Sequence, residues 1–123
     1  SDVYKRQILD YLQEKGCRGV YVEGFGLGGM PFLKNDFIGA VKKAVENGMV
    51  ILAGSQCRYE GSNLSVYETG RRALESGVLQ AYDMTAEAAM AKLMWVLGQT
   101  DSLREIREYF SVDIAGEVTI PKE

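Results

Sequence analysis

Short polar side chains follow directly after an apolar run in the middle of the chain, where a ligand could be bound. Residues 49–53 are Met-Val-Ile-Leu-Ala, and Gly54, Ser55, Gln56 and Cys57 follow them. A short apolar run bounded by glycine is consistent with a buried strand, and open parallel sheets bind ligands outside the carboxyl ends of their strands. We therefore predict a small-molecule pocket at Ser55, Gln56 and Cys57. The alternative is an ordinary polar loop in which Cys57 packs as a small hydrophobic residue.

A second strand end of the same character lies about thirty residues earlier. Residues 19–23 lead into a loop with glycine at positions 24, 26, 28 and 29, and this spacing corresponds to one βαβ unit. The loop matches the dinucleotide-binding pattern G-x-G-x-x-G. Dinucleotide sites also use an acidic residue at the end of the second strand, but residues 54–56 are Gly-Ser-Gln. We therefore expect a tight turn and no nucleotide cofactor.

The residue types of the chain argue against covalent and metal-assisted catalysis. The chain contains no histidine, and its two cysteines, Cys17 and Cys57, lie forty positions apart, so neither a zinc cage nor a Cys/His pair can be built from it. Activation of Ser55 or Cys57 would need a base, and none stands near them in the sequence. Lys92 and Trp95 are interpreted as a snorkelling lysine that lies over an indole. We expect no catalytic residue, metal or cofactor in this chain.

The composition indicates one globular domain. With 123 residues, of which 46% are hydrophobic, the chain can form an ordinary core. Its 14 basic and 17 acidic residues give a net charge of -3, which argues against nucleic acid as a partner. The longest apolar stretch, residues 88–97, contains a lysine and is too short for a membrane span of about 20 residues. We expect reduced thiols and a cytoplasmic location, with no leader peptide.

Hydrophobic periodicity and turn residues predict alternating helices and strands. The predicted helices cover residues 8–15, 37–47, 66–76, 86–97 and 102–109, and the predicted strands cover 19–23, 49–53 and, weakly, 78–82. Such alternation is typical of a parallel sheet with helices on both faces. The expected fold class is therefore α/β, with a three-layer, flavodoxin-like parallel sheet. Because a helix precedes the first strand, the sheet is expected to be truncated at its N-terminal strand.

The predicted helix at residues 86–97 is apolar nearly all round. Thr85 can cap its first backbone amides. Met84, Met90, Met94 and Trp95 are expected in the core, because a helix of this kind is usually buried against the sheet and against a neighbouring element or a second subunit. Substituting Trp95 by Ala is accordingly expected to cost about 3–5 kcal/mol.

Seven blocks of the sequence carry more information together than any one alone. They are residues 23–32 (EGFGLGGMPF), 55–57 (SQC), 67–71 (YETGR), 77–78 (GV), 83–89 (DMTAEAA), 92–95 with 97–98 (KLMW, LG) and 115–118 (AGEV). In order and spacing they resemble the C-terminal domain of type I (cytosolic) bacterial L-asparaginases. The resemblance covers residues 8 to about 119. Residues 1–7 do not match, and we expect them to be foreign or mis-assembled sequence.

The resemblance implies hydrolysis of L-asparagine to L-aspartate and ammonia by a threonine nucleophile. In that family the nucleophile and the Thr, Asp and Lys side chains that assist it lie in the larger N-terminal domain, which this chain lacks. The chain alone is therefore expected to be inactive. The resemblance also implies a dimer or tetramer in which this domain supports the dimer and closes the neighbouring subunit's active site with the loop formed by Gly26, Leu27, Gly28 and Gly29. Many relatives have Asn at the last of these positions.

An effector or ligand pocket is implied at Glu23, Ser55, Gln56 and Cys57. In some cytosolic members the loop that matches residues 55–57 borders a pocket for asparagine, and those relatives have an arginine at the position of Glu23. Two other functions remain open. One is the asparaginase-like subunit of glutamyl-tRNA(Gln) amidotransferase, which shares these motifs, and the other is a stand-alone flavodoxin-like module that binds a small amino acid.

Overall fold

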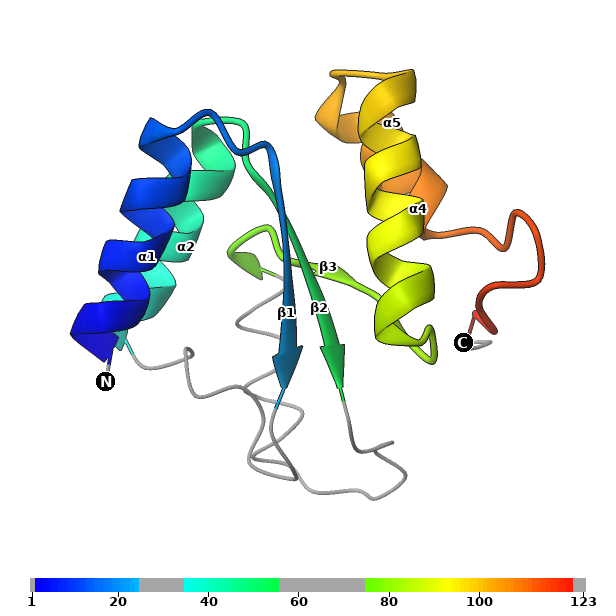
Figure 1. Ribbon diagram of the computed structural model, residues 1–123, viewed down its shortest axis with the longest axis horizontal. Helices are drawn as coiled ribbons and strands as arrows, with labels where there is room; N and C mark the ends of the chain where they lie inside the picture. Colours follow the sequence, from blue (N-terminus) through cyan, green and yellow to red (C-terminus); the bar gives the residue numbers. More distant parts are fainter. Residues whose placement is uncertain (1, 25–34, 56–74, 121–123) are drawn as a thin grey trace.

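The computed structural model describes residues 2–24, 35–55 and 75–120 of the chain (Figure 1). The helices and strands of these ranges follow one another in the predicted order. They are α1 (Asp2–Glu14), β1 (Gly19–Gly24), α2 (Asn35–Glu46), β2 (Val50–Ser55), β3 (Leu79–Gln80), α4 (Ala86–Gln99) and α5 (Leu103–Phe110). The helix predicted over residues 66–76 falls almost entirely outside the described ranges.

The three strands form a parallel sheet in the order β1-β2-β3. β1 and β2 pair over their whole length, from Gly19 opposite Val50 to Gly24 opposite Ser55. β3 pairs with β2 over two residues only. The predicted parallel sheet is thereby confirmed, and β1 forms one edge of the sheet in the part of the chain that is described.

Helices cover both faces of the sheet, which gives the expected three layers (Figure 1). α1 and α2 lie together on one face, and α4 and α5 lie on the other. Because side chains of a strand alternate between the two faces, β2 contributes to both cores. Ile51 and Ala53 belong to the core under α1 and α2, whereas Val50 and Leu52 belong to the core under α4 and α5.

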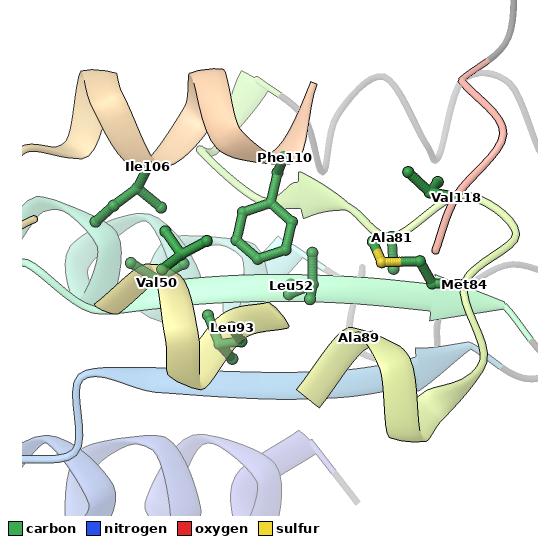
Figure 2. Packing of buried hydrophobic residues seen from close by; sticks show 10 residues of the cluster. Val50, Leu52, Ala81, Met84, Ala89, Leu93, Ile106, Phe110 and Val118 are labelled. Atoms are coloured by element: carbon green, nitrogen blue, oxygen red, sulfur yellow. The ribbon is translucent and has the colours of Figure 1, made fainter. Parts of the chain in front are cut away.

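The core under α4 and α5 is the larger of the two (Figure 2). Its buried members are Val50, Leu52, Ala81, Met84, Ala89, Leu93, Val96, Ile106, Phe110 and Val118. Met84 is 6% exposed, so its predicted core position is confirmed. Gly19 allows α4 to approach β1 closely, because a Cβ atom at this position would lie 2.8 Å from Cδ1 of Leu97.

The predicted capping residues begin two of the helices. Thr85 Oγ1 accepts a hydrogen bond from the Ala88 amide at 3.1 Å, and Ser102 Oγ accepts one from the Glu105 amide at 3.3 Å. α1 begins at Asp2 rather than at residue 8 as predicted, so residues 2–7 continue the helix. In the described ranges, no helix combines the length and the apolar character needed to cross a membrane.

The prediction that Met90, Met94 and Trp95 of α4 lie in the core is wrong. Met90, Met94 and Trp95 are 52%, 73% and 45% exposed. α4 packs on β1, β2 and α5, and no other element covers its outward face among the described residues. An apolar composition shows that a helix favours burial, but it does not show whether a single copy of the chain supplies the covering surface.

The interpretation of Lys92 as a snorkelling side chain over the Trp95 indole is also wrong. The Lys92 side chain is 4% exposed. Its Nζ donates to Oε2 of Glu117 at 2.6 Å and to the Val112 carbonyl at 2.7 Å, and it lies 5.4 Å from the centroid of the Phe110 ring. The tail that follows α5 supplies both acceptors, so the ammonium group is enclosed instead of reaching solvent.

The Glu117 carboxylate joins this tail to α4. Besides Lys92, it accepts hydrogen bonds from the amides of Ile114, at 3.0 Å, and Ala115, at 2.6 Å. Burial alone would raise the pKa of Glu117, but the hydrogen bonds from Lys92, Ala115 and Ile114 together hold that pKa well below its usual range. The carboxylate is therefore ionised, and the tail is fixed by a buried ion pair.

Candidate functional site

The carboxyl ends of β1 and β2 lie side by side, as predicted for a ligand-binding edge. The strand register sets Glu23 opposite Gly54 and Gly24 opposite Ser55. The remaining predicted site residues, Gly26, Leu27, Gly28, Gly29, Gln56 and Cys57, lie outside the described residues. The structure thus brings together Glu23 and Ser55 at the backbone level.

Tyr21 crosses from β1 to the end of β2. It lies two residues before Glu23, so both side chains belong to the face of the sheet that α4 covers. A Cβ atom on Gly54 would collide with the Tyr21 hydroxyl oxygen and would lie 2.8 Å from its Cζ. Only glycine leaves room for the phenol ring at this point. The glycine that precedes Ser55 therefore positions an aromatic hydroxyl at the predicted ligand-binding edge.

Two carboxylates act on the Tyr21 hydroxyl. Burial raises the pKa of Tyr21, and the negative charges of Glu23 and Glu87 raise that pKa further. The phenol is therefore neutral over the physiological pH range and can donate a hydrogen bond.

The start of α4 lies at the same end of the sheet (Figure 1). Thr85 caps the helix and Glu87 stands in its first turn. Tyr82, which follows β3, has a φ of 51°, in the left-handed region that non-glycine residues seldom occupy. Asp83 Oδ1 accepts a hydrogen bond from the Thr119 amide at 2.7 Å, so the tail after α5 also returns to this edge.

Cys17 and Lys92 lie away from this edge. Cys17 is a free, partly buried thiol that donates a hydrogen bond to the Gly19 carbonyl at 3.2 Å, at the amino-terminal end of β1. It belongs to a groove that also includes Arg18 and Lys43. Lys92 is held in its ion pair with Glu117.

Sequence reasoning missed two residues of the candidate site. Tyr21 could have been found from strand alternation, because it shares a face with Glu23 at a spacing of two. Glu87 could not, because more than sixty residues separate it from β1 and only the packing of α4 brings its charge near Tyr21. The sequence pattern assigned Glu87 only to the first turn of a helix.

Comparison with known proteins gives a consistent result. Residues 4–110 match the model of the family described as glutaminase/asparaginase C-terminal domain. The D subunit of glutamyl-tRNA(Gln) amidotransferase from Thermococcus kodakarensis is 47% identical over 113 residues, which cover 92% of this chain and 25% of the relative. An L-asparaginase from the same organism is 45% identical over 101 residues, which cover 82% of this chain and 30% of the relative.

The fold agrees with that of a solved structure. The thermostable L-asparaginase from Thermococcus kodakarensis has a TM-score of 0.76 and 39% identity, covering 93% of this chain and 34% of that one. The chain therefore spans between a quarter and about a third of the length of these relatives.

Proposed function

The chain belongs to the glutaminase/asparaginase C-terminal domain family, and from that premise we propose that it is the C-terminal domain of an L-asparaginase, which hydrolyses L-asparagine to L-aspartate and ammonia. The observation that carries the proposal is the 39% identity and TM-score of 0.76 to the thermostable L-asparaginase. In this proposal the chain is a cytoplasmic, non-catalytic domain. The nucleophile and its base belong to an N-terminal domain outside the chain.

The carboxyl edge of the sheet supports a role beside the substrate. L-Asparagine carries an α-ammonium group and a carboxylate. Glu23 and Glu87 make this edge electronegative and would attract the ammonium group, whereas the neutral Tyr21 hydroxyl would donate to an oxygen of the ligand. In this proposal the loop with Gly26 and Gly28 approaches the substrate through its backbone amides, which the absence of a Cβ atom allows.

A second candidate is the D subunit of glutamyl-tRNA(Gln) amidotransferase. One specific observation favours it: the match to that subunit is longer than the match to the L-asparaginase of the same organism, at 113 against 101 residues, and slightly more identical, at 47% against 45%. Membership of the bacterial type I group remains a prediction. The coding sequence upstream of the chain separates the candidates, because a threonine-containing asparaginase domain alone supports the first and an additional barrel-like domain before it supports the second.

An ammonia-release assay on the 123-residue chain tests the non-catalytic role. We expect no release from L-asparagine or L-glutamine beyond that of a heat-denatured control, because nucleophilic catalysis needs a nucleophile with an adjacent base. Circular dichroism on the same preparation should show that the chain is folded. Ammonia release by the folded chain that is lost on denaturation would contradict the proposal.

A further inference from the structure

The described methionines differ sharply in their exposure to solvent. Met49 and Met84 are 2% and 6% exposed and belong to the two cores, whereas Met90 and Met94 are 52% and 73% exposed. Methionine is among the residue types that are most often fully buried, so two open thioethers on one helix set α4 apart. α4 therefore offers two sulfur atoms to small solutes.

Met90 and Met94 lie one helical turn apart, on the outward face of α4. A spacing of four residues places both side chains on the same side of a helix. The packing of α4 on the sheet and on α5 uses the opposite side, whose buried residues are Ala89, Lys92, Leu93 and Val96. A chemical change at either exposed sulfur therefore leaves the packing of α4 in place.

From this contrast in burial we propose that Met90 and Met94 form a reversible oxidation site, with hydrogen peroxide as the oxidant. A lone pair of the thioether sulfur attacks one peroxide oxygen, and the O–O bond breaks. The hydroxide that leaves takes the proton of the transferred oxygen and becomes water. The sulfur loses two electrons and becomes a sulfoxide, and the peroxide gains those electrons.

The two buried methionines are protected from the same reaction. Peroxide reaches Met49 or Met84 only when the surrounding structure opens, and the core segments of a folded domain are open for a very small fraction of the time. A sulfoxide at Met84 would also place a polar oxygen in the core under α4 and α5, which is unfavourable without a hydrogen-bond donor. The fold therefore directs oxidation to α4.

Oxidation changes the polarity of this face of α4 without unfolding the helix. α4 has two charged residues, Glu87 in its first turn and the buried Lys92, so the face around Met90 and Met94 is apolar while both sulfurs are reduced. A sulfoxide is polar, and methionine sulfoxide reductases, one for each epimer, return it to the thioether. The inference does not rest on the proposed function, so its failure would leave that function unaffected.

Timed treatment of the folded 123-residue chain with hydrogen peroxide at neutral pH tests the inference. Trypsin cleaves after Lys92, which places Met90 and Met94 in separate peptides, and tandem mass spectrometry measures the sulfoxide at each methionine. We expect Met90 and Met94 to be oxidised at least about tenfold faster than Met49 and Met84. The same treatment in urea should bring these rates within about twofold of one another, because unfolding exposes the buried sulfurs.

The matched control is Leu93→Met, which adds a methionine directly beside Met94 but on the buried side of the same helix. Leu93 is 5% exposed, and exchange of leucine for methionine nearly conserves volume. The introduced methionine should be oxidised at least about tenfold more slowly than Met94 of the same chain. Circular dichroism confirms that the variant is folded.

Reversibility and the intact fold are checked on the oxidised wild-type chain. Its urea midpoint should equal that of the untreated chain, and a mixture of the two methionine sulfoxide reductases should return the peptides with Met90 and Met94 to their original mass. Equal oxidation rates of Met94 and Met84 in the folded chain, or of Met94 and the methionine introduced by Leu93→Met, would overturn the inference. A lowered urea midpoint after oxidation, or sulfoxides that the reductases leave unchanged, would overturn it as well.

Discussion

The ion pair between Lys92 and Glu117 gives the sharpest prediction of stability. Its side chains are 4% and 14% exposed, so removing one partner leaves the other with little access to water. Glu117→Ala leaves the Lys92 ammonium with only the Val112 carbonyl as a described acceptor. Breaking a buried pair in this way costs about 3–5 kcal/mol. That cost would be a large part of the roughly 5–15 kcal/mol by which a domain of this kind is stable.

The opposite substitution should be milder. Lys92→Met removes the buried ammonium and keeps most of its volume, whereas the Glu117 carboxylate retains the Ile114 and Ala115 amides as donors. The loss is then that of one charge-assisted hydrogen bond, about 1.5–3 kcal/mol. The double variant Lys92→Met with Glu117→Ala should lose at least about 1 kcal/mol less than the sum of the single losses, because the two residues are in contact.

Equilibrium unfolding in urea measures these differences. Circular dichroism reports the helices, and fluorescence of Trp95, the single tryptophan of the chain, reports the surroundings of α4. The slope against urea should stay constant across the variants, so the midpoints report stability directly. A Glu117→Ala variant within about 1 kcal/mol of the wild type, or a Lys92→Met variant that is the less stable of the two, would refute the reasoning.

Three further predictions follow from the same contacts. The pKa of Glu117 is lower in the folded chain than in the unfolded chain. The ionised carboxylate therefore stabilises the fold above the unfolded-state pKa of about 4.3, and this stabilisation is lost as the pH falls further. Urea midpoints between pH 5 and 3 should fall more steeply for the wild type than for Glu117→Gln, and parallel curves would count against the ion pair. Trp95→Ala should lower the free energy of unfolding by about 1–2 kcal/mol, because the indole is 45% exposed and makes one aromatic contact. A loss above about 4 kcal/mol in the same assay would mean that the indole is buried, contrary to the structure. Gly54→Ala should lower the free energy of unfolding by about 1–3 kcal/mol, because the added methyl group would collide with Tyr21. In a double-variant cycle, Tyr21→Ala should remove most of that loss. Additive losses would disprove the contact.

Local patterns predict the parts of the fold that depend on neighbouring residues in the chain. β2 lies where the sequence predicts it, between the glycine that follows α2 and the polar residues after the apolar run. Thr85 and Ser102 cap helices because the capping hydrogen bond spans only three residues. The shared carboxyl edge of β1 and β2 follows from their being parallel, so the backbone positions of Glu23 and Ser55 could be predicted.

Long-range packing explains what could not be predicted. Lys92 and Glu117 are 25 residues apart, and only the return of the tail across α4 turns an amphipathic lysine into a buried cation. The exposure of Met90, Met94 and Trp95 depends on which elements cover α4, a property that hydrophobic periodicity does not contain. The effect of the Glu87 charge on the pKa of Tyr21 likewise depends on how α4 packs against the sheet.

In the proposed function, this chain completes an amide-hydrolysing site whose catalytic groups lie elsewhere. The most direct measurement is ammonia release from L-asparagine by a chimaera in which this chain replaces the matching C-terminal part of the Thermococcus kodakarensis L-asparaginase, to which it is 39% identical in the superposed structures. We expect kcat/KM of the chimaera to exceed that of the catalytic part alone by at least about a hundredfold. A folded chimaera with no more activity than the catalytic part alone would contradict it.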